Sequence, residues 1–236
     1  MIALTPSPAI QTWTACGRVA FMTAWLVVLS GCATLPPWIR GGTSDADRSK
    51  YGATADQRMN DLTEKAKAAK AGSSTLQTEF TRDLARQVFE EHDPRVRCAI
   101  VRTAAGFDTP AALSVCRGAL EDPDERVRVT ACTVWRERGG PEAVELLAAR
   151  YSADREIDVR LRALRELGQL GDKGAIPVLA RALEDPDPAV QYRAVVALRR
   201  VSGRDLGDDV NAWRAWAADP EGGPEWSIAE GFRSLF

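Results

Sequence analysis

Hydrophobic positions recur with a helical period through the C-terminal part of the chain. A Val followed by Arg or Gln stands at residues 96, 127, 159 and 190, so the pattern returns after 31, 32 and 31 residues. Small or apolar residues continue after each Val at steps of three and four, for example at Ile100 and Ala104 in the first unit. A motif that returns at a near-constant interval predicts a repeat protein built from short amphipathic helices.

Each unit also carries signals for the start and end of its helices. An acid stands three residues before each Val and predicts a helix N-cap, at Asp93, Asp124, Glu156 and Asp187. Glycines predict the ends of the first helices, near Gly106, Gly139, Gly168 and Gly203. A second helix is predicted to follow in each unit, after Pro110, Pro141, Gly174 and Asp209. Every unit is therefore predicted to be a helical hairpin.

A single hairpin cannot bury its apolar face, so neighbouring hairpins must stack. We therefore predict an all-α fold, an α-solenoid of about four helical hairpins over residues 93–220. Residues 56–92 are predicted to add N-terminal helices, because a polar helical stretch is followed there by an amphipathic one. Residues 32–55 are rich in Gly, Pro, Ser and Thr and are predicted to form a flexible tether.

The C-terminal end is rich in aromatic residues. Trp213 and Trp216 lie three residues apart on one predicted helix, and the tail over 221–236 carries further apolar side chains. The last repeat of a solenoid needs a shield for its core. We interpret 221–236 as a capping tail and favour capping for Trp213 and Trp216, with partner docking as the alternative.

The first 31 residues predict an export signal. They contain no acid and one Arg, and their apolar run from Val19 to Leu29 is roughly half the length of a membrane-spanning helix. The run ends in Leu29, Ser30, Gly31 and Cys32, which resembles the bacterial lipobox. That resemblance implies cleavage before Cys32, lipidation of its thiol and a membrane-anchored lipoprotein facing the periplasm. Ala33 after the cysteine implies the outer membrane.

The repeat itself resembles a known family. The acid, the Val-Arg pair, the glycine turn and the Asp-Pro turn are similar to the short HEAT-like repeat of the phycobilin-lyase type over about residues 93–218. The whole layout also resembles uncharacterised HEAT-repeat lipoproteins of planctomycete-type bacteria. These resemblances imply a protein-binding scaffold or adaptor in the envelope. An enzyme or enzyme accessory of the bilin-lyase or repeat-oxygenase type, and a purely structural envelope protein, stay as alternatives.

The composition of the chain argues against nucleic-acid binding and against a histidine-based metal site. The chain has 31 Lys and Arg against 33 Asp and Glu, so no overall positive field favours nucleic acid. His92 is the single histidine, whereas the repeat oxygenases bind two irons through several His-Glu pairs. We expect no catalytic residue, no metal and no cofactor, and a partner that is an unidentified protein.

The candidate partner-binding residues are arginines and tryptophans. Arg97, Arg128 and Arg160 recur at the repeat interval, and we name them the arginine ladder. They are predicted to bridge adjacent repeats through the capping acids, with an acidic or phosphate ligand as the alternative. The second helices are expected to line a smooth concave groove, where Arg181 lies at an exposed position. The remaining candidates are Trp213 and Trp216.

The cysteines leave one question open. Cys98, Cys116 and Cys132 remain after the predicted signal and the lipidated cysteine are set aside. Cys116 and Cys132 occupy positions that hold larger apolar residues in sister repeats, so buried thiols are expected. A disulfide between them in an oxidising periplasm stays an alternative.

Overall fold

The computed structural model describes residues 49–50 and 52–220 of the chain. Two compact units are distinguished, Met1–Ala53 and Thr54–Phe236, and almost all described residues belong to the second. The predicted signal peptide, the lipobox with Cys32 and the capping tail lie outside the described residues. In the described part, no helix is both long enough and apolar enough to cross a membrane.

The second unit is built from helices in its described residues. Their bounds are α3 Ala55–Ala71, α4 Ser74–Glu90, α5 Pro94–Ala104, α6 Pro110–Gly118, α7 Glu125–Arg138, α8 Gly140–Ala153, α9 Ile157–Leu170, α10 Ile176–Ala182, α11 Pro188–Ser202 and α12 Val210–Ala218. Short 3₁₀ turns at Ala119–Glu121 and Lys173–Ala175 extend two of the hairpins. The all-α prediction is confirmed.

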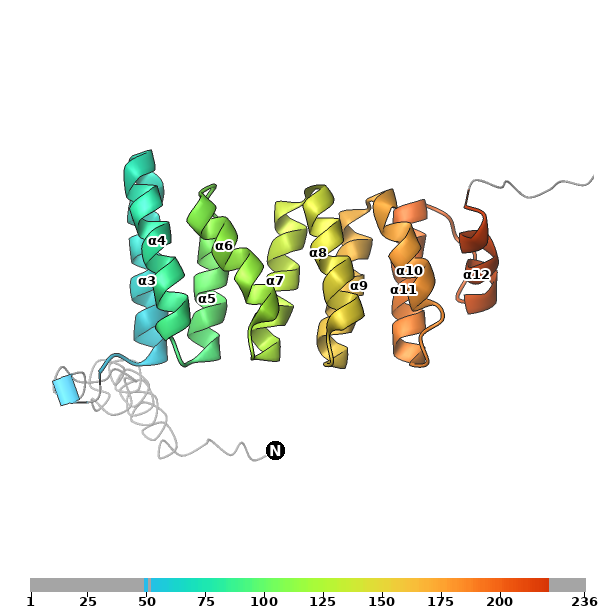
Figure 1. Cartoon of the computed structure of the whole chain (residues 1–236), viewed down its shortest axis with the longest axis horizontal. Coiled ribbons are helices and arrows are strands. Elements are labelled where there is room, and N and C mark those ends of the chain that lie inside the picture. The colour runs from blue at the N-terminus through green and yellow to red at the C-terminus, as the bar shows by residue number, and fades with distance from the viewer. Residues whose placement is uncertain (1–48, 51, 221–236) are drawn as a thin grey trace, which may run out of the picture. The chain divides into compact units, whose positions relative to one another are not determined.

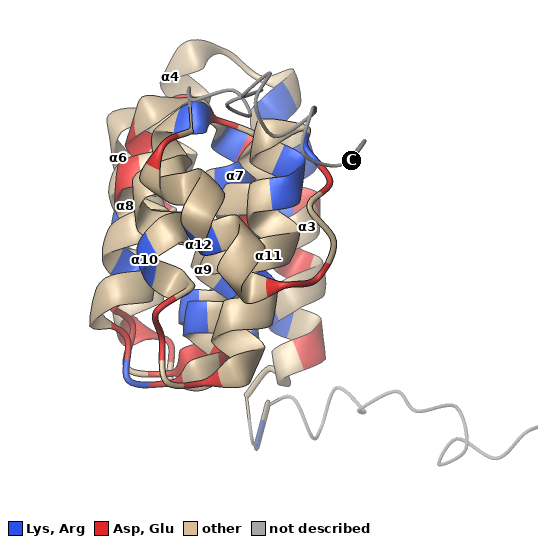
Figure 2. Ribbon diagram, turned by 90° about the vertical axis from the view of Figure 1, so that its right-hand side faces the viewer, with Lys and Arg blue, Asp and Glu red and all other residues tan. Residues whose placement is uncertain are grey.

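Successive helices pair into hairpins that stack in one row (Figure 1). Each odd-numbered helix from α3 to α11 packs against the next odd-numbered one, and α4 packs on α6 in the same way. Figure 2, which looks along the row, separates α4, α6, α8 and α10 on one side from α3, α7 and α11 on the other. We name the layer of α3, α5, α7, α9 and α11 the first-helix layer, and that of α4, α6, α8, α10 and α12 the second-helix layer.

The stack contains one more hairpin than the sequence period indicates. Helices α3 and α4 pack on α5 and α6 as a further hairpin. Thr54 caps α3, and Arg58 lies four residues after it, as Arg97 lies four after Asp93. Because α3 and α4 have 17 residues each, Arg58 precedes Arg97 by 39 positions instead of 31 or 32, and this hid the first unit.

The predicted caps mostly form. Asp93, Asp124 and Asp187 each accept a hydrogen bond from the backbone N–H two residues later, at 2.9, 2.9 and 2.8 Å. Glu156 occupies the N-cap of α9 but makes no side-chain cap bond. Cap chemistry therefore starts three of these four first helices, and packing suffices for α9.

One of the glycines predicted to mark a helix end lies inside its helix. Gly168 lies inside α9, and the helix ends instead at Gly171, whose φ of 69° is left-handed. A Cβ on Gly168 would lie 2.7 Å from the Cα of Ala197 on α11. Gly168 is thus required for close approach of two helices, and Gly171 supplies the turn.

Candidate binding surfaces

The arginine ladder joins adjacent hairpins. Arg97 makes a bidentate pair with Asp122, with N–O distances of 2.9 and 2.8 Å, and Arg128 makes one with Asp154 at 2.8 and 3.0 Å. Arg160 forms an ion pair with Asp185 at the corresponding place in the next unit, through the single contact of its Nη2 with Oδ2. Each of these aspartates lies in the turn that leads into the next hairpin, so the ladder fixes the spacing between units.

The same arginines also donate hydrogen bonds to backbone carbonyls of the turns. Arg97 Nη1 donates to the carbonyl of Glu91 at 3.1 Å, and Arg128 Nη1 donates to that of Asp122 at 2.9 Å. Gln191 keeps this one contact in the last unit, donating to the Asp185 carbonyl at 2.7 Å. In the first hairpin, Arg58 pairs with Glu91 at 2.9 Å and extends the ladder.

The bridging interpretation of the ladder is confirmed, but its partner is corrected. The bridging acid stands two positions before the capping acid, and its carboxylate also accepts the backbone N–H of that residue, as Asp122 does from Asp124 at 2.8 Å. Each bridging acid therefore accepts hydrogen bonds both from the backbone of its turn and from the arginine, and these bonds hold its carboxylate in place. The capping acids pair locally instead, as Asp124 does with Arg126 at 2.8 Å.

The arginines of the ladder are largely buried, which argues against a role in binding a ligand. The side chains of Arg97 and Arg128 are 12% and 13% exposed. The hydrogen bonds that Arg97 and Arg128 donate to Asp122 and Asp154 raise the pKa of these two guanidinium groups. Burial disfavours the charged form of Asp154, but the bonds from Arg128 and a backbone N–H outweigh it and lower its pKa. The ligand role that stood as the alternative for the ladder is therefore corrected to a structural one, which for Arg160 follows from its ion pair with Asp185.

The other candidate binding residues, Trp213, Trp216 and Arg181, differ in how far they are buried. Trp213 is fully buried and its Nε1 donates to the Gly207 carbonyl at 2.8 Å, so a partner-binding role for it is corrected to a core role. Trp216 is half-buried and packs edge-on against Trp213, with ring centroids 5.6 Å apart. Arg181 lies exposed on the second-helix layer, as predicted.

The cysteines are separate thiols. Cys98, Cys116 and Cys132 are buried and free, which decides the open question against a disulfide. Burial raises the pKa of Cys132 to about 12, so its thiol stays protonated and unreactive near neutral pH. Within the described residues, no group of three or more His, Cys, Asp or Glu side chains is placed to hold a metal ion.

A continuous groove lies on the first-helix layer. It has a volume of about 690 Å³ and takes lining residues from all five first helices. The lining consists of Met59, Arg95, Cys98, Arg102, Glu125, Arg126, Val129, Thr130, Asp158, Leu161, Arg162, Arg165 and Arg193. The groove lies on the layer opposite to the second helices, for which the sequence predicted a groove, and we name this surface the first-helix groove.

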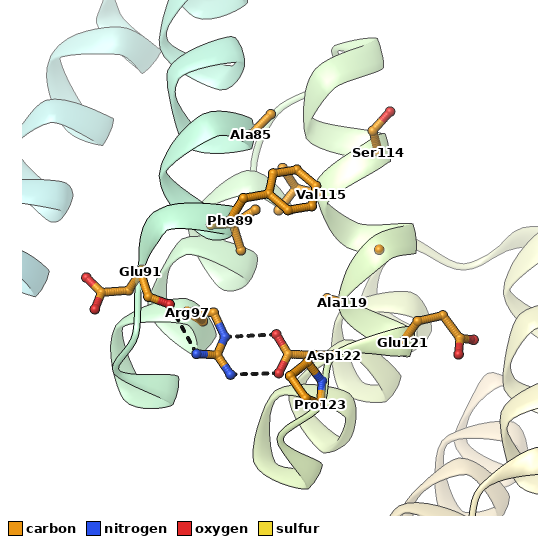
Figure 3. A pocket seen from close by; sticks show the side chains of 12 residues that line it. Ala85, Phe89, Glu91, Arg97, Ser114, Val115, Ala119, Glu121, Asp122 and Pro123 are labelled. Atoms are coloured by element: carbon orange, nitrogen blue, oxygen red, sulfur yellow. Dashed lines mark hydrogen bonds and ion pairs between the residues drawn. The ribbon is translucent and has the colours of Figure 1, made fainter.

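A smaller pocket opens between α4 and α6 on the second-helix layer. It has a volume of about 340 Å³, and Figure 3 shows the Phe89 ring beside Val115 above the Arg97 and Asp122 pair. Phe89 is 89% exposed, the highest value among the exposed large hydrophobic side chains of the described residues. The pocket involves two hairpins only, so it is a local feature and not a surface shared by the whole stack.

The stacked hairpins, arranged in two layers of helices, define an α-solenoid repeat protein. The family model of HEAT repeats matches residues 82–158 and 147–219, which together span more than half of the chain. The chain therefore belongs to the HEAT-repeat family, whose members generally act as non-enzymatic scaffolds for protein interaction. A comparison with curated proteins finds no match.

Proposed function

We propose that the protein is a membrane-anchored lipoprotein of the bacterial envelope that binds another protein in its first-helix groove. The observation that carries the binding role is that one groove receives side chains from all five hairpins. The anchor is supported by the sequence from Leu29 to Cys32, and the proposed location is the periplasmic side of the outer membrane.

The groove has the dimensions of a peptide site. Packed helices lie about 8–10 Å apart, so five of them in a row span roughly 32–40 Å. An extended segment rises about 3.3 Å per residue, so about ten to twelve residues would cross the groove. A protein segment fills such a length better than a small metabolite does, because a metabolite touches one or two repeats only.

The anchor is tested with the Cys32→Ser variant. Without the thiol no acyl chain can be attached, so this variant should move from the membrane fraction to the soluble fraction. Mass spectrometry of the wild-type N-terminal peptide should show the added lipid. Equal membrane retention of both forms would contradict the anchor.

The binding surface is tested by crosslinking in living cells. A photoreactive amino acid is introduced at Val129 in the groove and, as a control, at Ala149, which is exposed on the second-helix layer. A discrete crosslinked protein is expected from Val129 and not from Ala149. No crosslink at Val129, or the same products at both positions, would refute the groove as the binding surface.

A further inference from the structure

The arginines of the first-helix groove fall into two sets. Three of them are paired with acids of their own hairpin: Arg95 with Asp93 at 2.9 Å, Arg126 with Asp124 at 2.8 Å, and Arg162 with Glu166 at 3.3 Å. The other three form no ion pair with a described carboxylate: Arg102, Arg165 and Arg193. Arg102 only donates to the hydroxyl of Thr130, at 3.4 Å.

Two of the three arginines without an ion pair lie beside a further arginine, Arg200. Arg165 and Arg193 also line a smaller cavity of about 150 Å³ between α9 and α11, together with Arg200. That cavity has no acidic lining residue, and it includes Gly168, where α9 and α11 approach each other closely. The structure thus gathers three guanidinium groups that form no ion pair with a carboxylate of the described residues.

The rest of the first-helix groove is lined by acidic and apolar side chains. Glu125 and Asp158 line it from the first turns of α7 and α9, and the apolar side chains of Val129 and Leu161 line it as well. Figure 2 shows acidic residues in turns at the lower ends of the helices. The groove thus presents apolar surface and two carboxylates beside its arginines, so a ligand that contacts all of it needs apolar side chains as well as negative charge.

We infer that the first-helix groove takes an acidic segment of a partner protein that also carries apolar side chains. Its carboxylates pair with Arg102, Arg165 and Arg193, because a guanidinium binds a carboxylate through two parallel hydrogen bonds. Its apolar side chains contact Val129 and Leu161. This inference rests on the proposed function and adds the chemistry of the partner.

The test uses a synthetic peptide and the full-length protein. A fluorescent twelve-residue peptide in which Glu and Asp alternate with Leu and Val is titrated with wild type and with the triple variant R102Q/R165Q/R193Q. The matched control is R82Q/R86Q/R155Q, which removes three exposed arginines that do not line the groove. Circular dichroism verifies that both variants are folded.

The groove variant should bind the peptide about tenfold or more weakly than wild type, with the control within about twofold, because interfacial charge pairs are lost only from the groove. Binding should weaken as salt rises. Equal loss in both variants would overturn the inference, as would equal binding of the same peptide with Lys in place of Glu and Asp. A single-stranded oligonucleotide that binds as tightly as the peptide would identify a general polyanion site and overturn it too.

Crosslinking at Val129 separates this inference from the proposed function. Loss of the crosslinked partner in the R102Q/R165Q/R193Q background supports the acidic-segment site. A partner still captured in that background overturns the inference and leaves the groove as a protein-binding surface. No partner captured by the wild-type groove overturns the proposed function itself.

Discussion

Replacing Arg128 by Gln tests whether the arginine ladder stabilises the stack. Gln is the residue that the last hairpin carries at this place, where Gln191 donates to a turn carbonyl. The Arg128→Gln protein should keep that single contact and lose both bonds to Asp154, at 2.8 and 3.0 Å, together with the bond to the Pro123 carbonyl at 3.2 Å. Of the contacts that the substitution removes, the two to Asp154 are the ones that join adjacent hairpins.

The expected loss follows from burial and from the partners that remain. A hydrogen bond to a charged group contributes about 1.5–3 kcal/mol, and two such bonds to Asp154 are removed. Asp154 keeps Arg150 at 3.2 Å and the Glu156 N–H at 3.0 Å, so it does not become an unpaired buried charge. We therefore expect a loss of about 3 kcal/mol, the low end of the cost of breaking a buried pair.

The assay is thermal and urea unfolding followed by circular dichroism. A loss of about 3 kcal/mol lowers Tm by roughly 6–12 °C in a domain of this size. Arg126→Gln is the matched control, because the Arg126 side chain is 62% exposed and pairs only within its own turn. If Arg128→Gln melts at the same temperature as Arg126→Gln, the ladder does not stabilise the contact between hairpins.

Two further predictions concern packing and pH. Gly168→Ala should lower stability by about 1 kcal/mol, since overpacking against Ala197 costs about 1–3 kcal/mol and better helix propensity returns about 1. Gly118→Ala, where nothing lies within 4 Å, should instead raise Tm, and shifts of the same sign would contradict the close approach. The pKa of Asp154 is lowered, so its contribution is complete above its unfolded pKa of about 3.9 and falls as pH drops toward the folded value. Acid unfolding of Asp154→Asn should therefore be less steep below about pH 4, and identical acid transitions would refute this.

The repeat was predictable because its signals are local. A capping acid, a Val three residues later and a glycine after the helix each act within one hairpin, so the period of 31 or 32 residues is visible in the sequence. The first hairpin was missed as a repeat because its two long helices change the interval. The end of α9 was misplaced because one sequence signal, a glycine, serves two purposes, a turn at Gly171 and close packing at Gly168.

The sequence by itself determined the helices, their hairpin order and the all-α class, because helix periodicity and capping depend on neighbours a few residues apart. Only the tertiary structure decided which arginines are free for a partner. Arg97 and Arg193 both lie on first helices, yet Arg97 pairs with Asp122, 25 residues away, whereas Arg193 faces the groove. Whether a charge is neutralised depends on which acid the stacking of hairpins brings beside it, and that distance is set by the fold.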